Sequence, residues 1–308
     1  HQIHHIQSKR ETHLHRHDLD RVVPQLADAR QNIRREVGVA VDHRLLRRHA
    51  HVALVDPQGA RLGRAMALYL GERGFDVAVH YSTSREGAEG VAKDIRAMGQ
   101  TAAAIRADLL NDDETEALYE AATEAFGGPI TCLVNSASIF EYDTIQSATR
   151  ESWDRHIGSN LRAPFVLTQA MARTIPDPLR DTNDEPVAQG LIVNMVDQRV
   201  RKLTPDFMTY TIAKMGLWAL TQTSARALAP KIRVNAIGPG PTMIGHRQSQ
   251  EHFDNQRKAT VLQRGSSPKE IVAALGYFLD APGVTGQLIC VDGGQHLGWK
   301  TPDIQGVE

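Results

Sequence analysis

Two side chains four residues apart form the most informative pattern in this sequence. Tyr210 and Lys214 lie in the segment 207–214 (FMTYTIAK), and Asp197 precedes Tyr210 by thirteen residues. On a helix, residues at this spacing share one face with Cβ atoms about 5 to 6 Å apart, and a nearby ammonium group favours the ionised phenol. We therefore expect Lys214 to lower the pKa of Tyr210, so that Tyr210 can donate a proton near neutral pH.

The same spacing also occurs by chance on helices whose lysine lies in solvent, so the elements around it matter. Apolar runs of strand length occur at 52–55, 77–81, 101–105, 131–135, 191–195, 232–237 and 288–291. Segments of helical periodicity separate them, for example at 61–72, 85–98, 113–126, 153–174, 207–228 and 268–279. This alternation predicts a single α/β domain over 51–308, with a Rossmann-type, doubly wound parallel sheet of about seven strands.

Two segments interrupt the alternation of strands and helices. Residues 176–190 are polar and rich in turn-forming residues, and residues 239–258 begin with alternating proline and glycine. Such residues end regular elements. We expect the second segment to be a mobile lid over a substrate.

Composition narrows the class of protein. The 308 residues carry a formal charge of −1 and show no basic stripe interleaved with aromatic residues, which gives no reason to expect a nucleic-acid partner. We find no apolar stretch long enough for a membrane span and no signal peptide. Cys132 and Cys290 each lie in an apolar run, which favours buried, reduced thiols in a cytoplasmic protein.

The first fifty residues differ from the rest because they are rich in His and Arg and contain no convincing strand. We interpret residues 1–50 as an atypical N-terminal extension that is either disordered or translated from a wrong reading frame. The alternation of His13, His15 and His17 also fits a transition-metal site on an extended segment, but we expect no functional metal site.

A glycine-bearing turn between a first strand and a helix is where a dinucleotide pyrophosphate binds, because free N–H groups and the helix dipole favour anions. Here the turn 55–63 reads VDPQGARLG, which does not match Gly-x-Gly-x-x-Gly. The other motifs are Asn135-Ser136-Ala137-Ser138, Asn160, Asp197, Tyr210-x-x-x-Lys214 and Pro239-Gly240. In combination they resemble the short-chain dehydrogenase/reductase family over roughly residues 51–298.

Within that family, the sequence resembles the pteridine reductase and dihydromonapterin reductase branch. Most members carry Ser where this chain has Asp197, and Arg61 in place of a turn glycine is a second mark of the branch, as is the segment 79–84 (VHYSTS). Phe140 matches the aromatic residue that stacks on the pterin, although a core aromatic is the alternative. Ser138 matches a polar neighbour of cofactor and substrate.

The resemblance implies a cofactor site. Its residues would be Gly59, Arg61, Leu62, Gly63, Tyr81, Ser84, Asp108, Leu109, Asn135, Ala137, Pro239 and Gly240. No carboxylate ends the second strand, which favours NADPH over NADH, and Arg61 and Ser84 offer donors to its 2′-phosphate. Arg61 is alternatively a solvated residue at the helix start. Asp108 would contact the adenine amino group or, alternatively, cap the following turn.

One feature departs from the family pattern. Asp56 and Pro57 stand where Thr-Gly is expected; Pro57 cannot adopt a positive φ or donate an N–H, and Asp56 adds negative charge near a pyrophosphate. We therefore expect weakened cofactor binding if these residues are native, or a frame error upstream of Gly59.

The implied reaction is NADPH-dependent reduction of the N5=C6 bond of a 7,8-dihydropterin of the dihydromonapterin, dihydrobiopterin or dihydrofolate type. Asp197, Tyr210, Lys214 and Asn160, which would support the lysine, form the expected catalytic set, and Ser138, Phe140, Asp197 and Tyr210 the expected substrate site. One alternative is a carbonyl reductase of the same family acting on a ketone or 3-oxoacyl thioester, and the other is a non-catalytic cofactor-binding pseudoenzyme. The resemblance also implies a homotetramer.

Overall fold

The computed structural model describes residues 52–55, 62–245 and 248–299. Several predictions concern residues outside these ranges: the N-terminal extension with His13, His15 and His17, the turn residues Asp56 and Pro57, and the cofactor residues Gly59 and Arg61. The division of the chain near residue 50 therefore stays a prediction.

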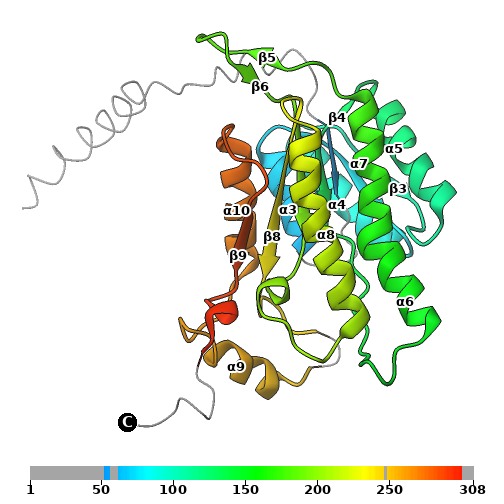
Figure 1. The fold of residues 1–308 in the computed structure, drawn as a ribbon. Coiled ribbons are helices and arrows are strands. Elements are labelled where there is room, and N and C mark those ends of the chain that lie inside the picture. Colours follow the sequence, from blue (N-terminus) through cyan, green and yellow to red (C-terminus); the bar gives the residue numbers. More distant parts are fainter. Residues whose placement is uncertain (1–51, 56–61, 246–247, 300–308) are drawn as a thin grey trace, which may run out of the picture. The chain divides into compact units, whose positions relative to one another are not determined.

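Within the described residues, the predicted seven-stranded parallel sheet is confirmed. Its order is β3-β2-β1-β4-β7-β8-β9, and every neighbouring pair is parallel (Figure 1). The strands are β1 (Val52–Val55), β2 (Asp76–Tyr81), β3 (Ala102–Arg106), β4 (Ile130–Asn135), β7 (Gly190–Met195), β8 (Ile232–Pro239) and β9 (Leu288–Val291). The order reverses between β1 and β4, which places a ligand-binding crevice at their carboxyl ends.

Helices cover both faces of the sheet (Figure 1). One face packs against α3 (Leu62–Glu72), α4 (Arg85–Ala97) and α10 (Pro268–Asp280), and the other against α5 (Asp112–Phe126), α7 (Ala163–Thr174) and α8 (Met208–Ala227). Side chains of one strand alternate between the two cores: Val55 packs with the first set and Leu54 with the second. This two-sided burial explains the continuous apolar runs in the sequence.

The long helix expected over 153–174 is interrupted. The chain forms α6 (Arg150–Ile157), a π-helical turn η1 (Gly158–Arg162) and then α7. The apolar periodicity of the sequence does not reveal such a turn. A single π-helical turn lies between two α-helical segments, and each segment still shows the helical pattern.

The two predicted interruptions contain short elements of their own. The segment 176–190 includes a small antiparallel pair, β5 (Leu179–Arg180) and β6 (Pro186–Val187), and the predicted lid contains α9 (Gln250–Lys258). Two 3₁₀ turns follow β7 and β9, namely η2 (Gln198–Arg201) and η3 (Gln295–Leu297).

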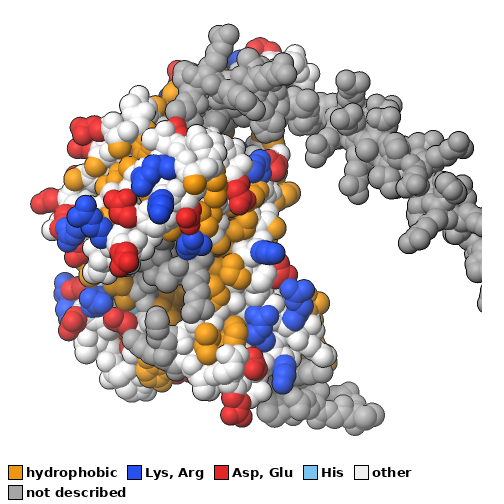
Figure 2. Space-filling model, turned by 180° about the vertical axis from the view of Figure 1, so that it is seen from behind, with side chains coloured by type: hydrophobic (Ala, Val, Ile, Leu, Met, Phe, Trp, Pro, Cys, Tyr) orange, Lys and Arg blue, Asp and Glu red, His pale blue; other side chains and the backbone are white. Residues whose placement is uncertain are grey.

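The surface is chemically mixed. On the face shown in Figure 2, side chains of both charges are interspersed with hydrophobic ones. Among the described residues, no helix combines the length and apolar character that crossing a membrane requires. Burial raises the pKa of the Cys132 thiol to about 12 and that of Cys290 to about 11, so both thiols are protonated at neutral pH.

A chain of buried amides connects the centre of the sheet to α8. Asn135 at the end of β4 donates its side-chain amide to Asn194 Oδ1 on β7 over 2.8 Å. Asn194 in turn donates to Thr221 Oγ1 on α8 over 2.9 Å, and Thr221 donates to the carbonyl of Leu217 over 2.8 Å. Every member of this chain therefore has a partner, and the helix is fixed relative to two strands.

We predict that Asn194→Ala lowers the free energy of unfolding by about 1 to 3 kcal/mol, because it leaves the buried Asn135 amide without its acceptor. Urea unfolding would measure this loss. Asn183→Ala, at an exposed position in the turn between β5 and β6, is the matched control and should change little. Equal stability of the two variants would contradict the structural role given to Asn194.

Candidate active site

A cavity of about 210 Å³ lies at the carboxyl ends of the central strands. Its lining consists of Leu62, Gly63, Met66, Ser136, Ser138, Met195, Val196, Asp197, Tyr210, Lys214, Pro239 and Gly240. The fold thus brings together residues from five separate segments, and most of them were predicted as site residues from sequence. Among the described residues, no group of three His, Cys, Asp or Glu is arranged to hold a metal ion.

The centre of the cavity is a hydrogen bond between the two predicted catalytic groups. Tyr210, which is only 5% exposed, donates its hydroxyl hydrogen to Asp197 Oδ2 over 3.0 Å. The other carboxylate oxygen, Oδ1, accepts the backbone N–H of Arg199 over 2.7 Å, at the first turn of η2. The backbone after β7 therefore orients the carboxylate, and the carboxylate orients the phenol.

The expectation of a lowered pKa for Tyr210 is wrong. Burial and the Asp197 carboxylate raise the pKa of Tyr210 well above its ordinary value, and the influence of Arg199 and a hydrogen bond from Ser138 offset this only in part. The physical reasons are the burial of the phenol, which has the largest effect, and the negative charge of the carboxylate bonded to its hydroxyl. Tyr210 is therefore a protonated phenol at neutral pH, and it gives up its proton only to a strongly basic group.

Lys214 is positioned one turn further along α8. Its Nζ donates to the carbonyl of Met195 over 2.8 Å and lies 5.7 Å from the centre of the Tyr210 ring. The side chain is 2% exposed, and burial lowers its pKa to about 8, although the attraction of Asp197 acts in the opposite direction. A donor that is buried at the cavity wall is suited to bind a hydroxyl group of a ligand.

Asn160 lies in the π-helical turn and is fully buried. Its amide donates to the carbonyl of Ile139 over 2.8 Å, and its oxygen accepts the N–H of Ile139 over 2.8 Å. These two bonds hold the loop after β4, which carries Ser138 and Phe140. The predicted support of Lys214 by Asn160 stays a prediction.

An aromatic cluster flanks the cavity beside Tyr210. Phe140 is 48% exposed, which excludes a core position for it. Its ring stacks on Phe207 with centroids 4.3 Å apart and planes 9° apart, and it meets Tyr210 edge-on at 4.7 Å. Tyr142 packs edge-on against Phe207 at 5.2 Å, and the Arg199 guanidinium lies 5.1 Å from the centre of the Phe207 ring.

Phe207 was missed by the sequence reasoning. It directly precedes α8 with φ 58° and ψ 51°, a left-handed conformation that is uncommon for a bulky side chain. A residue with this backbone lies off the helical face, so the 3.6-residue period gives no signal for it. Strained backbone of this kind often occurs at functional sites.

Several of the residues predicted to bind the dinucleotide lie at the start of α3 and between β2 and α4. Gly63 lies in the first described turn of α3 and lines the cavity, so the positive end of the helix dipole is available to an anion. Tyr81 ends β2, and Ser84, which is exposed, precedes α4 without capping it through its hydroxyl. A hydroxyl of this kind fits a phosphate, and the residues present therefore suit a dinucleotide phosphate.

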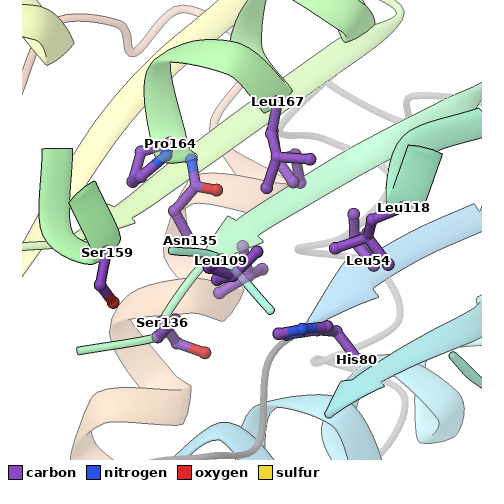
Figure 3. A pocket seen from close by; sticks show the side chains of 12 residues that line it. Leu54, His80, Leu109, Leu118, Asn135, Ser136, Ser159, Pro164 and Leu167 are labelled. Atoms are coloured by element: carbon purple, nitrogen blue, oxygen red, sulfur yellow. The ribbon is translucent and has the colours of Figure 1, made fainter. Parts of the chain in front are cut away.

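A second, small cavity of about 20 Å³ adjoins the same strand ends (Figure 3). Leu109, Asn135 and Ala137 line it, together with the buried His80, whose Nε2 donates to the carbonyl of Ala107 over 2.9 Å. The Asn135 amide is used in the chain to Asn194, so its part in cofactor binding stays a prediction.

Asp108 performs the alternative role considered from the sequence. Its Oδ1 accepts the N–H of Leu110 over 3.0 Å and so stabilises the turn before α5. Asn111 caps that helix by accepting the N–H of Glu114. An adenine contact of Asp108 stays a prediction.

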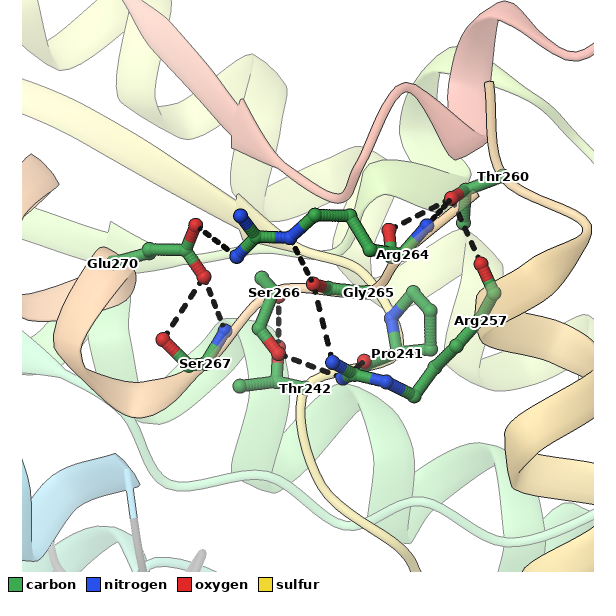
Figure 4. A network of polar contacts seen from close by, with 9 residues as sticks. All are labelled: Pro241, Thr242, Arg257, Thr260, Arg264, Gly265, Ser266, Ser267 and Glu270. Carbon is green, nitrogen blue, oxygen red and sulfur yellow. Dashed lines mark hydrogen bonds and ion pairs between the residues drawn. The ribbon is translucent and has the colours of Figure 1, made fainter. Parts of the chain in front are cut away.

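Pro239 and Gly240 end β8 at the cavity. A Cβ atom on Gly240 would lie 2.5 Å from the Cβ atom of Asp292, so only glycine fits there. Pro239 and Gly240 are the first residues of the predicted lid segment 239–258, and Arg257 holds the two ends of that segment together (Figure 4). The Arg257 Nη1 donates to the carbonyls of Pro241 and Ser266, each over 2.8 Å. The base of the segment is thus fixed, and its covering of a substrate stays a prediction.

Comparisons with known proteins agree with this geometry. A family model described as enoyl-(acyl carrier protein) reductase matches residues 59–296. The chain belongs to the short-chain dehydrogenase/reductase family. Like other members of that family it is an oxidoreductase, which favours the two enzymatic predictions over the pseudoenzyme alternative.

Individual relatives represent both enzymatic alternatives. The chain is 30% identical over 250 residues to a 3-oxoacyl-[acyl-carrier-protein] reductase, FabG, of Staphylococcus epidermidis, covering 80% of this chain and 98% of the relative. The structure of FolM alternative dihydrofolate reductase 1 from Brucella canis, complexed with NADP, is 40% identical, with a TM-score of 0.76 and coverage of 82% and 97%. A short chain dehydrogenase from Burkholderia cenocepacia, also in complex with NADP, is 30% identical, with a TM-score of 0.71 and coverage of 80% and 97%.

The lowered pKa of Lys214 leads to a prediction about stability. Between its folded value of about 8 and its ordinary value of 10.5, the unfolded chain binds more protons at this group than the folded chain does. The contribution of Lys214 to the free energy of unfolding therefore rises with pH across this window. We expect the difference in unfolding free energy between the native chain and Lys214→Met to increase over it.

Urea unfolding at several pH values in this window would measure the difference. Lys93→Met, at an exposed position on α4, is the control and should show no such increase. A difference that stays constant or decreases for Lys214→Met would contradict the depressed pKa.

Proposed function

We propose that this oxidoreductase uses NADPH to reduce a 7,8-dihydropterin of the dihydromonapterin, dihydrobiopterin or dihydrofolate type. The observation that carries the proposal is the hydrogen bond between Asp197 and Tyr210 in the cavity wall. In the pteridine branch of the family a carboxylate stands where most members have Ser. The 40% identity to a FolM dihydrofolate reductase solved with NADP supports both the substrate class and the cofactor.

The shape of the site supports a flat substrate. Phe140 is half exposed, and Phe207 stacks on it in parallel, so its ring is held in a defined plane next to the phenol. A planar bicyclic ring can stack on such a surface, whereas an extended acyl chain gains less from it. Bound NADPH supplies a hydride to C6 of the N5=C6 imine, and the N5 atom then requires a proton.

The residues of this chain provide that proton and hold the reactants. Tyr210 has a raised pKa, so its proton is retained until N5 becomes strongly basic as C6 is reduced. Asp197 keeps the hydroxyl directed along the cavity wall and accepts a hydrogen bond that a Ser hydroxyl would accept more weakly. Lys214 would bind the cofactor ribose, and Phe140 would align the pterin for transfer.

Carbonyl reduction is the second candidate, and one observation favours it. The Ser138 hydroxyl forms a hydrogen bond with Tyr210, and a Ser–Tyr pair can polarise a ketone oxygen. The identity of 30% to a 3-oxoacyl reductase is consistent with that chemistry. Asp197 opposes it, because a carboxylate repels the negative oxygen that develops during carbonyl reduction. Homotetramer assembly and a cytoplasmic location remain part of the proposal.

Substrate class can be tested by following NADPH oxidation with a panel of 7,8-dihydropterins and a panel of ketones and 3-oxoacyl thioesters. We expect selective turnover of dihydropterins and loss of that turnover in Asp197→Ser. The matched control is Asp154→Ser, which removes a carboxylate from an exposed ion pair with Arg150. Turnover of ketones alone would refute the pterin assignment, whereas dihydropterin turnover unaffected by Asp197→Ser would refute the role given to the carboxylate.

The role of Tyr210 can be tested separately. Tyr210→Phe removes only the hydroxyl, so we expect kcat to fall by well over tenfold, because a general acid typically contributes about a hundredfold or more to the rate. NADPH binding, measured by quenching of tryptophan fluorescence, should be retained. Tyr277→Phe removes a hydroxyl from an exposed ring on α10 and serves as the control. An unchanged kcat in Tyr210→Phe would show that another group donates the proton.

A further inference from the structure

The first turn of α8 is held by a buried polar cluster that no motif in the sequence indicated. Asp143, His156 and Thr209 are 3%, 0% and 2% exposed. The Thr209 hydroxyl donates to Asp143 Oδ2 and lies 2.7 Å from His156 Nδ1. Ser152 on α6 donates its hydroxyl to the same carboxylate oxygen over 3.0 Å. The cluster therefore joins the loop after β4, α6 and α8 at a point directly before Tyr210.

Asp143 acts as the N-terminal cap of α8. Phe207, which precedes the helix, cannot cap it because a benzene ring has no suitable acceptor. Instead, the N–H of Met208 donates to the carbonyl of Asp143 over 3.2 Å, and the N–H of Thr209 donates to Asp143 Oδ1 over 3.1 Å. These are N–H groups that a helix leaves unpaired at its start, where the helix dipole also favours an anion.

The charge of this cap is maintained at neutral pH. Burial acts to raise the pKa of Asp143, but hydrogen bonds from Thr209 and Ser152 outweigh burial, so its pKa lies below the ordinary value. The carboxylate is therefore ionised while it holds the helix.

His156 completes a consistent set of donors and acceptors. Its Nε2 accepts the N–H of Glu141 over 3.1 Å, which assigns the hydrogen of the neutral ring to Nδ1. That hydrogen faces the carbonyl of Ser152 at 2.8 Å and the hydroxyl of Thr209. Thr209 can therefore accept from His156 and donate to Asp143 at the same time. The ring also packs edge-on toward Tyr210, with centroids 6.1 Å apart.

The position of α8 matters because the central hydrogen bond spans two elements. Tyr210 lies on α8, whereas Asp197 follows β7, so a shift of the first helical turn changes the separation of the two groups. In enzymes a displacement of about 1 Å can lower the rate by up to about a hundredfold. Within the described chain, the residues that line the cavity include none of Asp143, His156 and Thr209, so this cluster acts through Tyr210.

We propose that Asp143, His156 and Thr209 form a positioning network that sets the Tyr210 phenol for proton transfer. The network does not contact the reacting atoms. The proposal does not depend on the pterin assignment, because the orientation of Tyr210 is required for either substrate class.

Thr209 offers a sharp test because two substitutions of similar size separate the hydroxyl from the packing. Thr209→Val keeps the shape and removes the hydroxyl, whereas Thr209→Ser keeps the hydroxyl. With the best substrate from the two panels, we expect Thr209→Val to lower kcat on the order of tenfold, with KM and NADPH binding little changed. Thr209→Ser should restore most of kcat.

Thr174→Val is the control for an effect of lost stability alone. It removes a hydroxyl at the C-terminal end of α7 that is bonded to Tyr119 over 2.6 Å. This control should lower the melting temperature and keep kcat. If Thr209→Val does not fold, Ser152→Ala, which removes one donor to Asp143, takes its place with the same expected fall in kcat. An unchanged kcat in the folded variant, equal losses in Thr209→Val and Thr209→Ser, or an equal loss in Thr174→Val would overturn the proposal.

Discussion

The hydrogen bond between the Asp197 carboxylate and the buried phenol of Tyr210 is the interaction on which the rest of the site depends. A negative charge beside a buried hydroxyl raises the pKa of that hydroxyl, so the phenol keeps its proton at neutral pH. Lys214 is bonded through its Nζ to the carbonyl of Met195 and not to the phenol oxygen. The site therefore holds a weak acid close to a carboxylate, an arrangement suited to protonating a strongly basic atom.

Much of the surrounding structure maintains that one contact. The Asn135–Asn194–Thr221 chain fixes α8 against two strands, and Asn160 fixes the loop after β4. These groups are buried and each has a hydrogen-bond partner, which makes each of them costly to remove. On the outer side of the cavity, Arg257 anchors α9 and the segment around it through the carbonyls of Pro241 and Ser266.

The 3-oxoacyl reductase and the FolM dihydrofolate reductase are both similar to this chain over most of its length. Overall similarity therefore does not decide which substrate this chain uses. Identity to a 3-oxoacyl reductase and to a FolM dihydrofolate reductase is expected when the sheet, the Tyr–Lys helix and the cofactor side are shared. The distinguishing features are on the substrate side: Asp197 and the exposed ring of Phe140 with Phe207 stacked on it. They are the features on which the proposed preference for a flat, nitrogen-containing ring rests.

The sequence by itself determined the sheet, its order of alternating strands and helices, and the joint position of Tyr210 and Lys214, because these depend on local periodicity and on a spacing within one helix. It also indicated Asp197 and Phe140 through family resemblance. Only the tertiary structure decided the direction of the Tyr210 pKa, the left-handed Phe207, the π-helical turn at Asn160 and the cap formed by Asp143. Each of these depends on contacts between distant segments, such as the 66 residues that separate Asp143 from Thr209, or on backbone geometry that no periodic pattern records.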